Sequence, residues 1–381
     1  MHIDLTPEQR SLRDELRAYF DSIPRTHGRT AWNEPRAPDY RDVCRRLGRD
    51  GWLGIGWPVE YGGQGRGPVE QLIFFEEAER ARVPMPVIAL NTVGPTLMRF
   101  GSDEQKAFFL PQILAGEIDF AIGYTEPEAG TDLASLRTRA VREGDEYVIN
   151  GNKIFTSGAE DCEYVWLAAR TNAEVPKHRG ITIFIVETST PGFKVTPITT
   201  LSGLQTTATY YEDVRVPASA IVGGENEGWK LITNQLNHER VALATTGWVR
   251  SIWEQVVEWA CSNGVIAEPW VQLNLARVDA RIEALKLFNW RVAAGLERGD
   301  LSPAPASATK VYGTEMVIEA YRLMLEIVGR AGYVKRRTEG SVLDGVLEQA
   351  YRSAVINTFG GGVNEIQRMI IATAGLGMPR G

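Results

Sequence analysis

Residues Ala121–Arg137 read AIGYTEPEAGTDLASLR, and the rest of the chain can be placed around this stretch. The stretch is expected to begin as the end of a β-strand and to continue into a turn lined by Thr125, Gly130 and Thr131. Hydroxyl groups and free backbone N–H groups in such a turn can hold a phosphate or the polar edge of a ring. A tight loop stabilised by its own side chains explains the same residues more simply. From these residues alone, both interpretations stay open.

The hydrophobic pattern changes on both sides of this stretch. Before residue 120, apolar residues recur with a helical period, as in Val69–Arg82. Beyond it the pattern alternates, with β-branched and aromatic runs such as Ile181–Val186. The helical period returns near residue 225. The sequence therefore predicts an α+β protein with an N-terminal helical domain (residues 1–119), a central antiparallel β-domain (120–223) and a C-terminal helical domain (224–381).

Two local features of the N-terminal domain are also predicted. Thr6, Pro7 and Gln9 have the arrangement of an N-cap, a first-turn proline and a capping-box residue, so a helix should begin at Pro7. Pro111 interrupts the helical run Gly101–Glu117, which is therefore expected to form two short helices.

Bulk properties exclude several classes of protein. The net charge of −7 and the absence of a Lys/Arg cluster argue against nucleic-acid binding. Cys44, Cys162 and Cys261 show no CxxC or Cys/His spacing, so we expect neither disulfides nor a metal site. The N-terminus does not have the form of a signal peptide, and the longest uncharged run, Val83–Met98, is too short and too rich in proline to cross a membrane. A cytoplasmic enzyme is expected.

A second stretch, Leu231–Leu243, carries a carboxylate on its apolar side. Steps of four and three residues place Glu239 on the same helical stripe as Ile232 and Leu236. A buried carboxylate is costly unless it is paired, protonated or used in catalysis. By itself the pattern favours a core ion pair, either to Arg240 or to a distant arginine. A general base with a raised pKa is the alternative.

The string TEPEAGTD at Thr125–Asp132 closely resembles the flavin-binding signature of the acyl-CoA dehydrogenase family. The resemblance extends over essentially the whole chain and implies the family fold, in which an N-terminal helical domain and a central β-domain precede a C-terminal four-helix bundle. The other similar segments, in chain order, are Gly101–Glu117, Gly151–Gly158, Asp213–Pro217, Gly224–Trp229 and Asn364–Ile371.

The resemblance implies that the chain binds FAD without a Rossmann unit, which agrees with the absence of a GxGxxG fingerprint. Ile122, Tyr124 and Thr125 are expected to contact the flavin ring, largely through backbone groups. Gly130 and Thr131 are expected to approach the pyrophosphate.

Two further flavin contacts are implied in the segment that resembles the strand facing the ring. Phe155 is expected to cover the ring, and the Ser157 hydroxyl to meet N5. Many members of the family have tryptophan and threonine at these positions. A donor near N5 or the pyrimidine edge stabilises the reduced flavin, and serine keeps that donor.

The reaction implied by the resemblance is α,β-dehydrogenation of an acyl-CoA thioester. A carboxylate removes the α-proton while the β-hydrogen leaves as a hydride to flavin N5. Many members carry this base just before the C-terminal IQR helix, but Gly361 stands there in this chain. The isovaleryl and long-chain branches have instead a glutamate followed by an arginine on a bundle helix, and Glu239 and Arg240 match that pair. Glu239 is therefore expected to be the catalytic base and Arg240 an anchor of its helix.

Two motifs with which homo-oligomeric members reach a neighbour's FAD are altered. The Arg-x-x-Phe-Gly region reads CSNGVIAEPWVQL at Cys261–Leu273, and Gln-x-x-Gly-Gly becomes EIVGR at Glu326–Arg330. A glutamate would repel the pyrophosphate. The chain is therefore expected to work with a second acyl-CoA dehydrogenase-like subunit in an α2β2 assembly. It most resembles the base-carrying subunit of actinobacterial heterotetramers that act on steroids with a three-carbon side-chain CoA thioester. An electron-transfer flavoprotein is the implied electron acceptor.

Two other functions remain open. The chain could be a non-catalytic subunit that shapes a partner's pocket, although TEPEAGTD and Glu239 argue against this. It could also be a flavin oxidase or hydroxylase on the same fold, which would differ in whether the reduced flavin reacts with oxygen.

Overall fold

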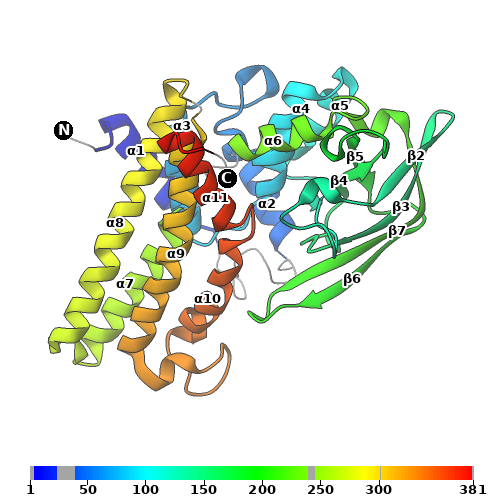
Figure 1. Ribbon diagram of the computed structural model, residues 1–381. Coiled ribbons are helices and arrows are strands. Elements are labelled where there is room, and N and C mark those ends of the chain that lie inside the picture. Colours follow the sequence, from blue (N-terminus) through cyan, green and yellow to red (C-terminus); the bar gives the residue numbers. More distant parts are fainter. Residues whose placement is uncertain (1–3, 24–38, 239–244, 301, 380–381) are drawn as a thin grey trace.

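Three structural regions follow one another along the chain (Figure 1). The computed structural model describes residues 4–23, 39–238, 245–300 and 302–379. Helices form the first region, a twisted sheet the second, and long helices the third, as the sequence predicts. The helices of the first region are α1 (Pro7–Asp21), α2 (Tyr40–Arg49), α3 (Pro68–Arg80), α4 (Gly94–Phe100) and α5 (Asp103–Ala115).

The two local predictions for this region have different outcomes. The capping box at the start of α1 is confirmed, because Thr6 and Gln9 bond to each other's backbone N–H through their side chains. The predicted break at Pro111 is wrong, since α5 continues through it. Proline removes one backbone hydrogen bond, but burial of Leu110 and Ile113 on either side of it favours a single helix.

The central region is one eight-stranded sheet with the order β6-β7-β3-β2-β4-β5-β8, in which β1 lies beside β4. Most neighbours are antiparallel, as expected, but β1 and β2 both pair with β4 in parallel. Parallel neighbours need a long connection, and the intervening strands and turns provide it. The strands are β1 (Phe120–Gly123), β2 (Arg139–Glu143), β3 (Glu146–Ile154), β4 (Tyr164–Arg170), β5 (Ile181–Glu187), β6 (Phe193–Thr199), β7 (Gln205–Pro217) and β8 (Ile221–Val222).

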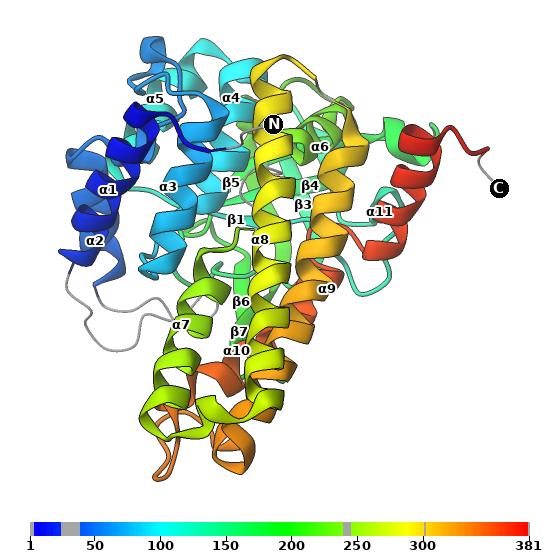
Figure 2. The same ribbon diagram turned by 90° about the vertical axis from the view of Figure 1, so that its left-hand side faces the viewer.

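The helices of the third region form a bundle beside the sheet. In Figure 2, α7, α8 and α9 run alongside one another, and α11 lies against the outer side of α9. Val256, Leu275 and Met324 are buried where the three long helices meet. Within the described ranges, no helix has the length and apolar character to cross a membrane. The helices are α6 (Gly228–His238), α7 (Gly247–Ser262), α8 (Pro269–Glu297), α9 (Pro303–Val328), α10 (Val346–Ala354) and α11 (Asn364–Ile370).

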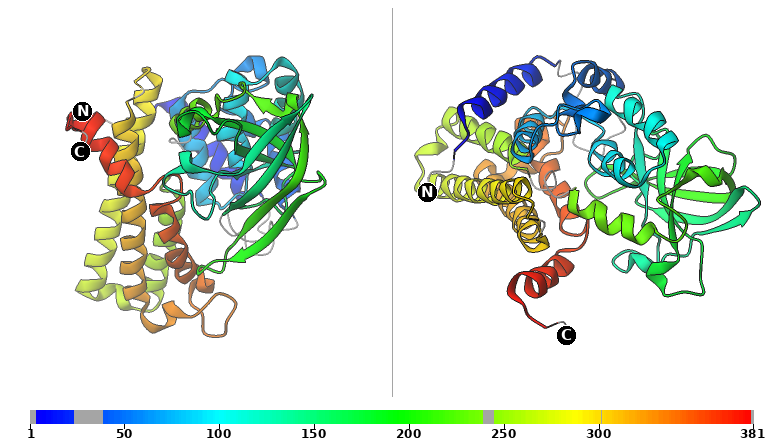
Figure 3. Two further views of the ribbon diagram at one scale, coloured as in Figure 1. Left: turned by 45° about the vertical axis from the view of Figure 1, so that its right-hand side comes forward. Right: turned by 90° about the horizontal axis from the view of Figure 1, so that it is seen from above.

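Helix α6 occupies the junction of the three regions. Seen from above in Figure 3, it runs between the sheet and the bundle, and it packs against α4 and β5. Leu231 and Ile232 are buried in the core that this helix shares with the first region. The expected helix is thus present as far as His238, whereas Glu239 and Arg240 lie outside the described residues.

Candidate functional site

The two segments expected to bind the flavin meet at one end of the sheet. Strand β1 ends at Gly123 and leads into Tyr124 and Thr125, while β3 ends at Ile154. The backbone N–H of Ile154 donates to the carbonyl of Thr125 at 2.8 Å. This bond places the residues that follow β1 directly beside those that follow β3.

The segment after Thr125 forms a tight turn whose far side is open. Glu126 and Ala129 exchange two backbone hydrogen bonds of 3.1 and 3.0 Å. Gly130 and Thr131 follow and are exposed, and a Cβ atom added at Gly130 would meet no atom of the described ranges within 4 Å. The hydroxyl and backbone N–H groups expected to approach a phosphate therefore lie at an accessible surface.

A buried ion pair that the sequence did not predict holds this turn in place. Lys153, which is fully buried on β3, donates from Nζ to Glu126 Oε1 at 2.8 Å and to the Tyr124 carbonyl at 3.0 Å. The Glu126 carboxylate also accepts from the backbone N–H groups of Arg137 and Thr138, at 2.6 and 2.8 Å. Burial would raise the pKa of Glu126, but its attraction to Lys153 and these hydrogen bonds leave that pKa below its ordinary value.

A sequence signal for this pair existed. Lys153 follows Ile149 by four residues on β3. Side chains alternate between the two faces of a strand, so Lys153 points to the same face as buried Ile149. A lysine at an inward-facing position requires a buried acid, and the glutamate of the TEP string was available.

Phe155 and Ser157 were expected in a segment that resembles the strand facing the ring, but they lie directly after the end of β3 at Ile154. Phe155 is 59% exposed, and its backbone has a φ of 61°, which is uncommon for a bulky residue. The Ser157 hydroxyl shares a 2.8 Å hydrogen bond with the Thr206 hydroxyl on β7. A large aromatic ring held at the surface next to an open turn leaves an apolar face available for a flat ligand.

The side chain of Tyr124 links the β1 turn to α6. Trp166 of β4 donates from its indole N–H to the Tyr124 hydroxyl at 3.0 Å, and that hydroxyl donates to Oε1 of Gln235. Ile122, one residue before the end of β1, is half-buried. The resemblance pointed to Tyr124 mainly for its backbone, and it did not identify Trp166 or Gln235.

The glycine-rich turn before α11 lies around a buried lysine. Lys310 of α9 donates from Nζ to the carbonyls of Thr358 and Gly362, at 3.2 and 2.7 Å, and to Asn364 Oδ1 at 2.8 Å. Burial lowers the pKa of Lys310 to about 8, despite nearby acids. Gly361 has a φ of 65° and carries no side chain, so this turn offers no carboxylate at that position.

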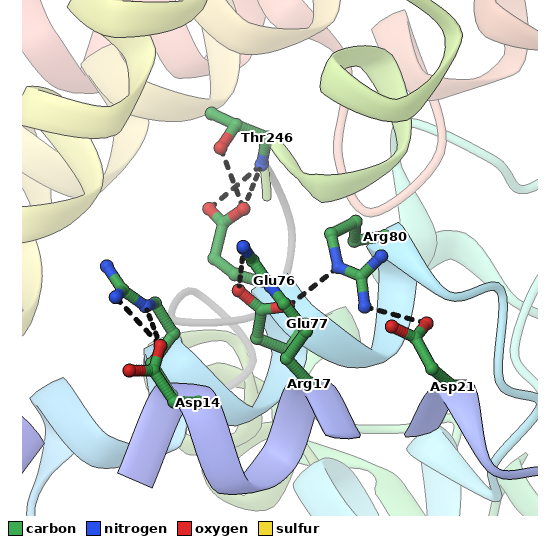
Figure 4. Close-up of polar contacts among 8 residues, drawn as sticks. Asp14, Arg17, Asp21, Glu76, Glu77, Arg80 and Thr246 are labelled. Atoms are coloured by element: carbon green, nitrogen blue, oxygen red, sulfur yellow. Dashed lines mark hydrogen bonds and ion pairs between the residues drawn. The ribbon is translucent and has the colours of Figure 1, made fainter. Parts of the chain in front are cut away.

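Acidic side chains of α3 hold the chain where it enters α7 (Figure 4). Glu76 accepts from the Thr246 backbone N–H at 2.9 Å and from its hydroxyl at 2.7 Å. Glu79 accepts from the Thr245 hydroxyl, and burial raises the pKa of Glu79 to about 7. Glu77 faces α1 instead and pairs with Arg17 at 2.7 Å. The residues that directly follow segment 239–244 are therefore fixed to α3.

The surface expected to face a second subunit contains exposed apolar side chains and one exposed, ion-paired acid. Trp270 and Leu273, at the start of α8, are 47% and 51% exposed. Glu326 on α9 pairs with Arg322 and accepts from Asn274 Nδ2 at 3.3 Å. Its charge is thus partly balanced within the chain.

Three domains of a known protein family match most of the chain. The N-terminal domain of acyl-CoA dehydrogenases matches residues 6–117, the middle domain matches residues 121–214, and the C-terminal domain matches residues 226–376. The match to the middle domain includes both segments of the site described above.

Individual relatives are similar over their full length. Acyl-CoA dehydrogenase FadE26 of Mycobacterium tuberculosis is 50% identical, with 100% of this chain and 99% of the relative covered. Among solved structures, the Tcur3481-Tcur3483 steroid ACAD has 53% identity and a TM-score of 0.96, and both chains are covered completely. The ChsE4-ChsE5 complex from M. tuberculosis has 50% identity and a TM-score of 0.91, again with both chains covered completely.

Proposed function

Because the chain belongs to the acyl-CoA dehydrogenase family of FAD-dependent oxidoreductases, we propose that it oxidises the Cα–Cβ bond of an acyl-CoA thioester whose acyl group is a steroid side chain. The observation that carries this proposal is the junction of the β1 and β3 ends, which brings the TEPEAGTD turn beside Phe155. The similarity to a solved steroid ACAD supports the class of substrate.

The residues at this junction fit FAD. The exposed ring of Phe155 provides an apolar face for a flat ring system, and Ser157 adds a hydroxyl beside it. Gly130 and Thr131 lie on the open side of the turn, where there is room for a pyrophosphate. Ile122, Tyr124 and Thr125 would contact the ring from the β1 side, largely through their backbone groups. When bound, FAD supplies the hydride acceptor.

Glu239 is proposed as the base that accepts the α-proton, with Arg240 as an anchor of its helix. Both residues lie outside the described part of the chain. Two observations support the assignment. Gly361 leaves the alternative base position without a carboxylate. Helix α6, which leads toward Glu239, lies next to the proposed flavin site through the bond between Tyr124 and Gln235.

A second, different subunit is proposed to complete the FAD site. The segment Cys261–Leu273 has neither the arginine nor the phenylalanine that the family motif supplies to a neighbour, and Glu326 stands where that motif has glutamine. Solved relatives support such pairing, since one is a ChsE4-ChsE5 complex. An α2β2 assembly that passes its electrons to an electron-transfer flavoprotein follows from this proposal.

The subunit proposal predicts how much FAD the protein retains. Purified alone, the chain should hold less than about one tenth of an equivalent of FAD per chain, because its copy cannot supply the missing contacts. Co-expressed with the partner subunit, it should hold one FAD per pair, measured by flavin absorbance after denaturation. A lone homo-oligomer that retains one FAD per chain would contradict the need for a partner.

A further inference from the structure

An amide group buried on α6 has no partner for its N–H groups among the residues that the structure describes. Gln235 is 2% exposed, yet its Nε2 meets no hydrogen-bond acceptor in the part of the chain that the structure describes. Buried donors are almost always paired, and an exception commonly marks a missing ligand or water. The amide nitrogen is therefore expected to face a bound group.

The oxygen of the same amide, in contrast, has a hydrogen-bond partner. An indole N–H can only donate, so Trp166 makes the Tyr124 hydroxyl an acceptor at 3.0 Å. That hydroxyl directs its own proton to Oε1 of Gln235. The amide oxygen is thus occupied, and Nε2 with its two N–H groups is left for another acceptor.

The position of Gln235 relates this free donor to the proposed active site. Tyr124, its partner, directly precedes Thr125 of the TEPEAGTD turn. A ligand held against this turn would therefore lie near the Gln235 amide, which bonds to Tyr124.

We propose that Gln235 binds a carbonyl oxygen of the ligand at this site through its amide N–H groups, with Tyr124 and Trp166 holding the amide in the required orientation. This inference rests on the proposed function. The carbonyl belongs either to the flavin ring or to the acyl thioester, which present the same acceptor chemistry. In both cases Gln235 is a binding residue, and Tyr124 is a positioning residue that acts through it.

The test measures binding by the complex with its partner subunit, independently of turnover. Three variants are compared with wild type: Gln235→Met, Gln235→Glu and Tyr124→Phe. Thr233→Val is the matched control, since Thr233 lies on the same helix, is exposed and donates from its hydroxyl to carbonyls of that helix. Dissociation constants are measured for FAD with the apo complex. They are also measured for an acyl-CoA analogue without β-hydrogens, which binds the holo complex but cannot react.

Gln235→Met and Tyr124→Phe should weaken one ligand at least tenfold, whereas Thr233→Val should leave both unchanged. Weakened FAD identifies the flavin carbonyl, and a weakened analogue with normal FAD identifies the thioester carbonyl. Gln235→Glu keeps the acceptor for Tyr124 and loses the donor, so its binding should recover as the pH falls and the acid is protonated. That recovery separates ligand binding from a packing role.

The inference would be overturned if the dissociation constants of every Gln235 variant lay within twofold of wild type and binding by Gln235→Glu did not depend on pH. The proposed function would then remain intact. A wild-type complex that binds neither FAD nor the analogue would instead contradict the proposed function itself.

Discussion

Glu239→Gln is expected to slow flavin reduction by acyl-CoA about a thousandfold while the complex keeps its FAD. Glutamine has the size and shape of glutamate but cannot accept the α-proton, and a general base typically contributes a factor of this order. The factor corresponds to about 4 kcal/mol in the activation barrier. Anaerobic stopped-flow measurement of the flavin absorbance, with substrate in excess, gives the rate directly.

The matched control is Glu227→Gln, at the start of the same helical segment. Glu227 is exposed, and its carboxylate forms a 3.9 Å ion pair with the exposed Lys230, so the substitution should leave the rate within twofold of wild type. If Glu239→Gln keeps more than a tenth of the wild-type rate, the base lies elsewhere in the complex.

Lys153→Met is expected to be the most destabilising single change at the flavin site. It would leave the Glu126 carboxylate buried without its cation, and breaking a buried pair in this way costs about 3–5 kcal/mol. The turn that carries Gly130 and Thr131 depends on the same carboxylate, so FAD should be lost together with stability. Urea unfolding measures the first effect and flavin content the second.

An exposed pair in the same neighbourhood provides the control. Lys177 and Asp132 form a 2.6 Å ion pair with both side chains more than half exposed, so Lys177→Met should change stability by less than about 1 kcal/mol. Adding Glu126→Gln to Lys153→Met should restore part of the lost stability, because the uncompensated charge is removed. Equal effects of the Lys153 and Lys177 substitutions would show that the buried pair does not hold the turn.

The order of the three regions could be predicted because the spacing of apolar residues depends on how one helix or strand is buried. The β-branched and aromatic run Ile181–Val186 predicts a strand, which is buried on both faces, and the helical spacing in Val69–Arg82 follows from which side of one helix faces the core. Pro111 shows where such local rules fail. The proline lowers the stability of the helix, but α5 continues through it because its side chains pack against residues distant in the chain. A local sequence pattern gives no information about that packing.

The site residues that carry the TEPEAGTD signature could be identified from the sequence, but the contacts that fix them could not. Gln235 is separated from Tyr124 by more than a hundred positions, and only the fold brings the two side chains together. Lys153 and Glu126 are also apart in the chain, although the inward-facing lysine hinted at a buried acid. Long-range polar pairs follow from how the elements pack, so they become visible only in three dimensions.

The measurement that tests the central claim most directly is an anaerobic titration of the wild-type complex with acyl-CoA thioesters. A thioester of a steroid with a three-carbon side chain should bleach the flavin with one equivalent per FAD, whereas straight-chain acyl-CoA of similar mass should require a large excess. Full bleaching by the straight-chain ester at one equivalent, with no response to the steroid ester, would contradict the proposed substrate. The absence of bleaching by any acyl-CoA would contradict the proposed reaction.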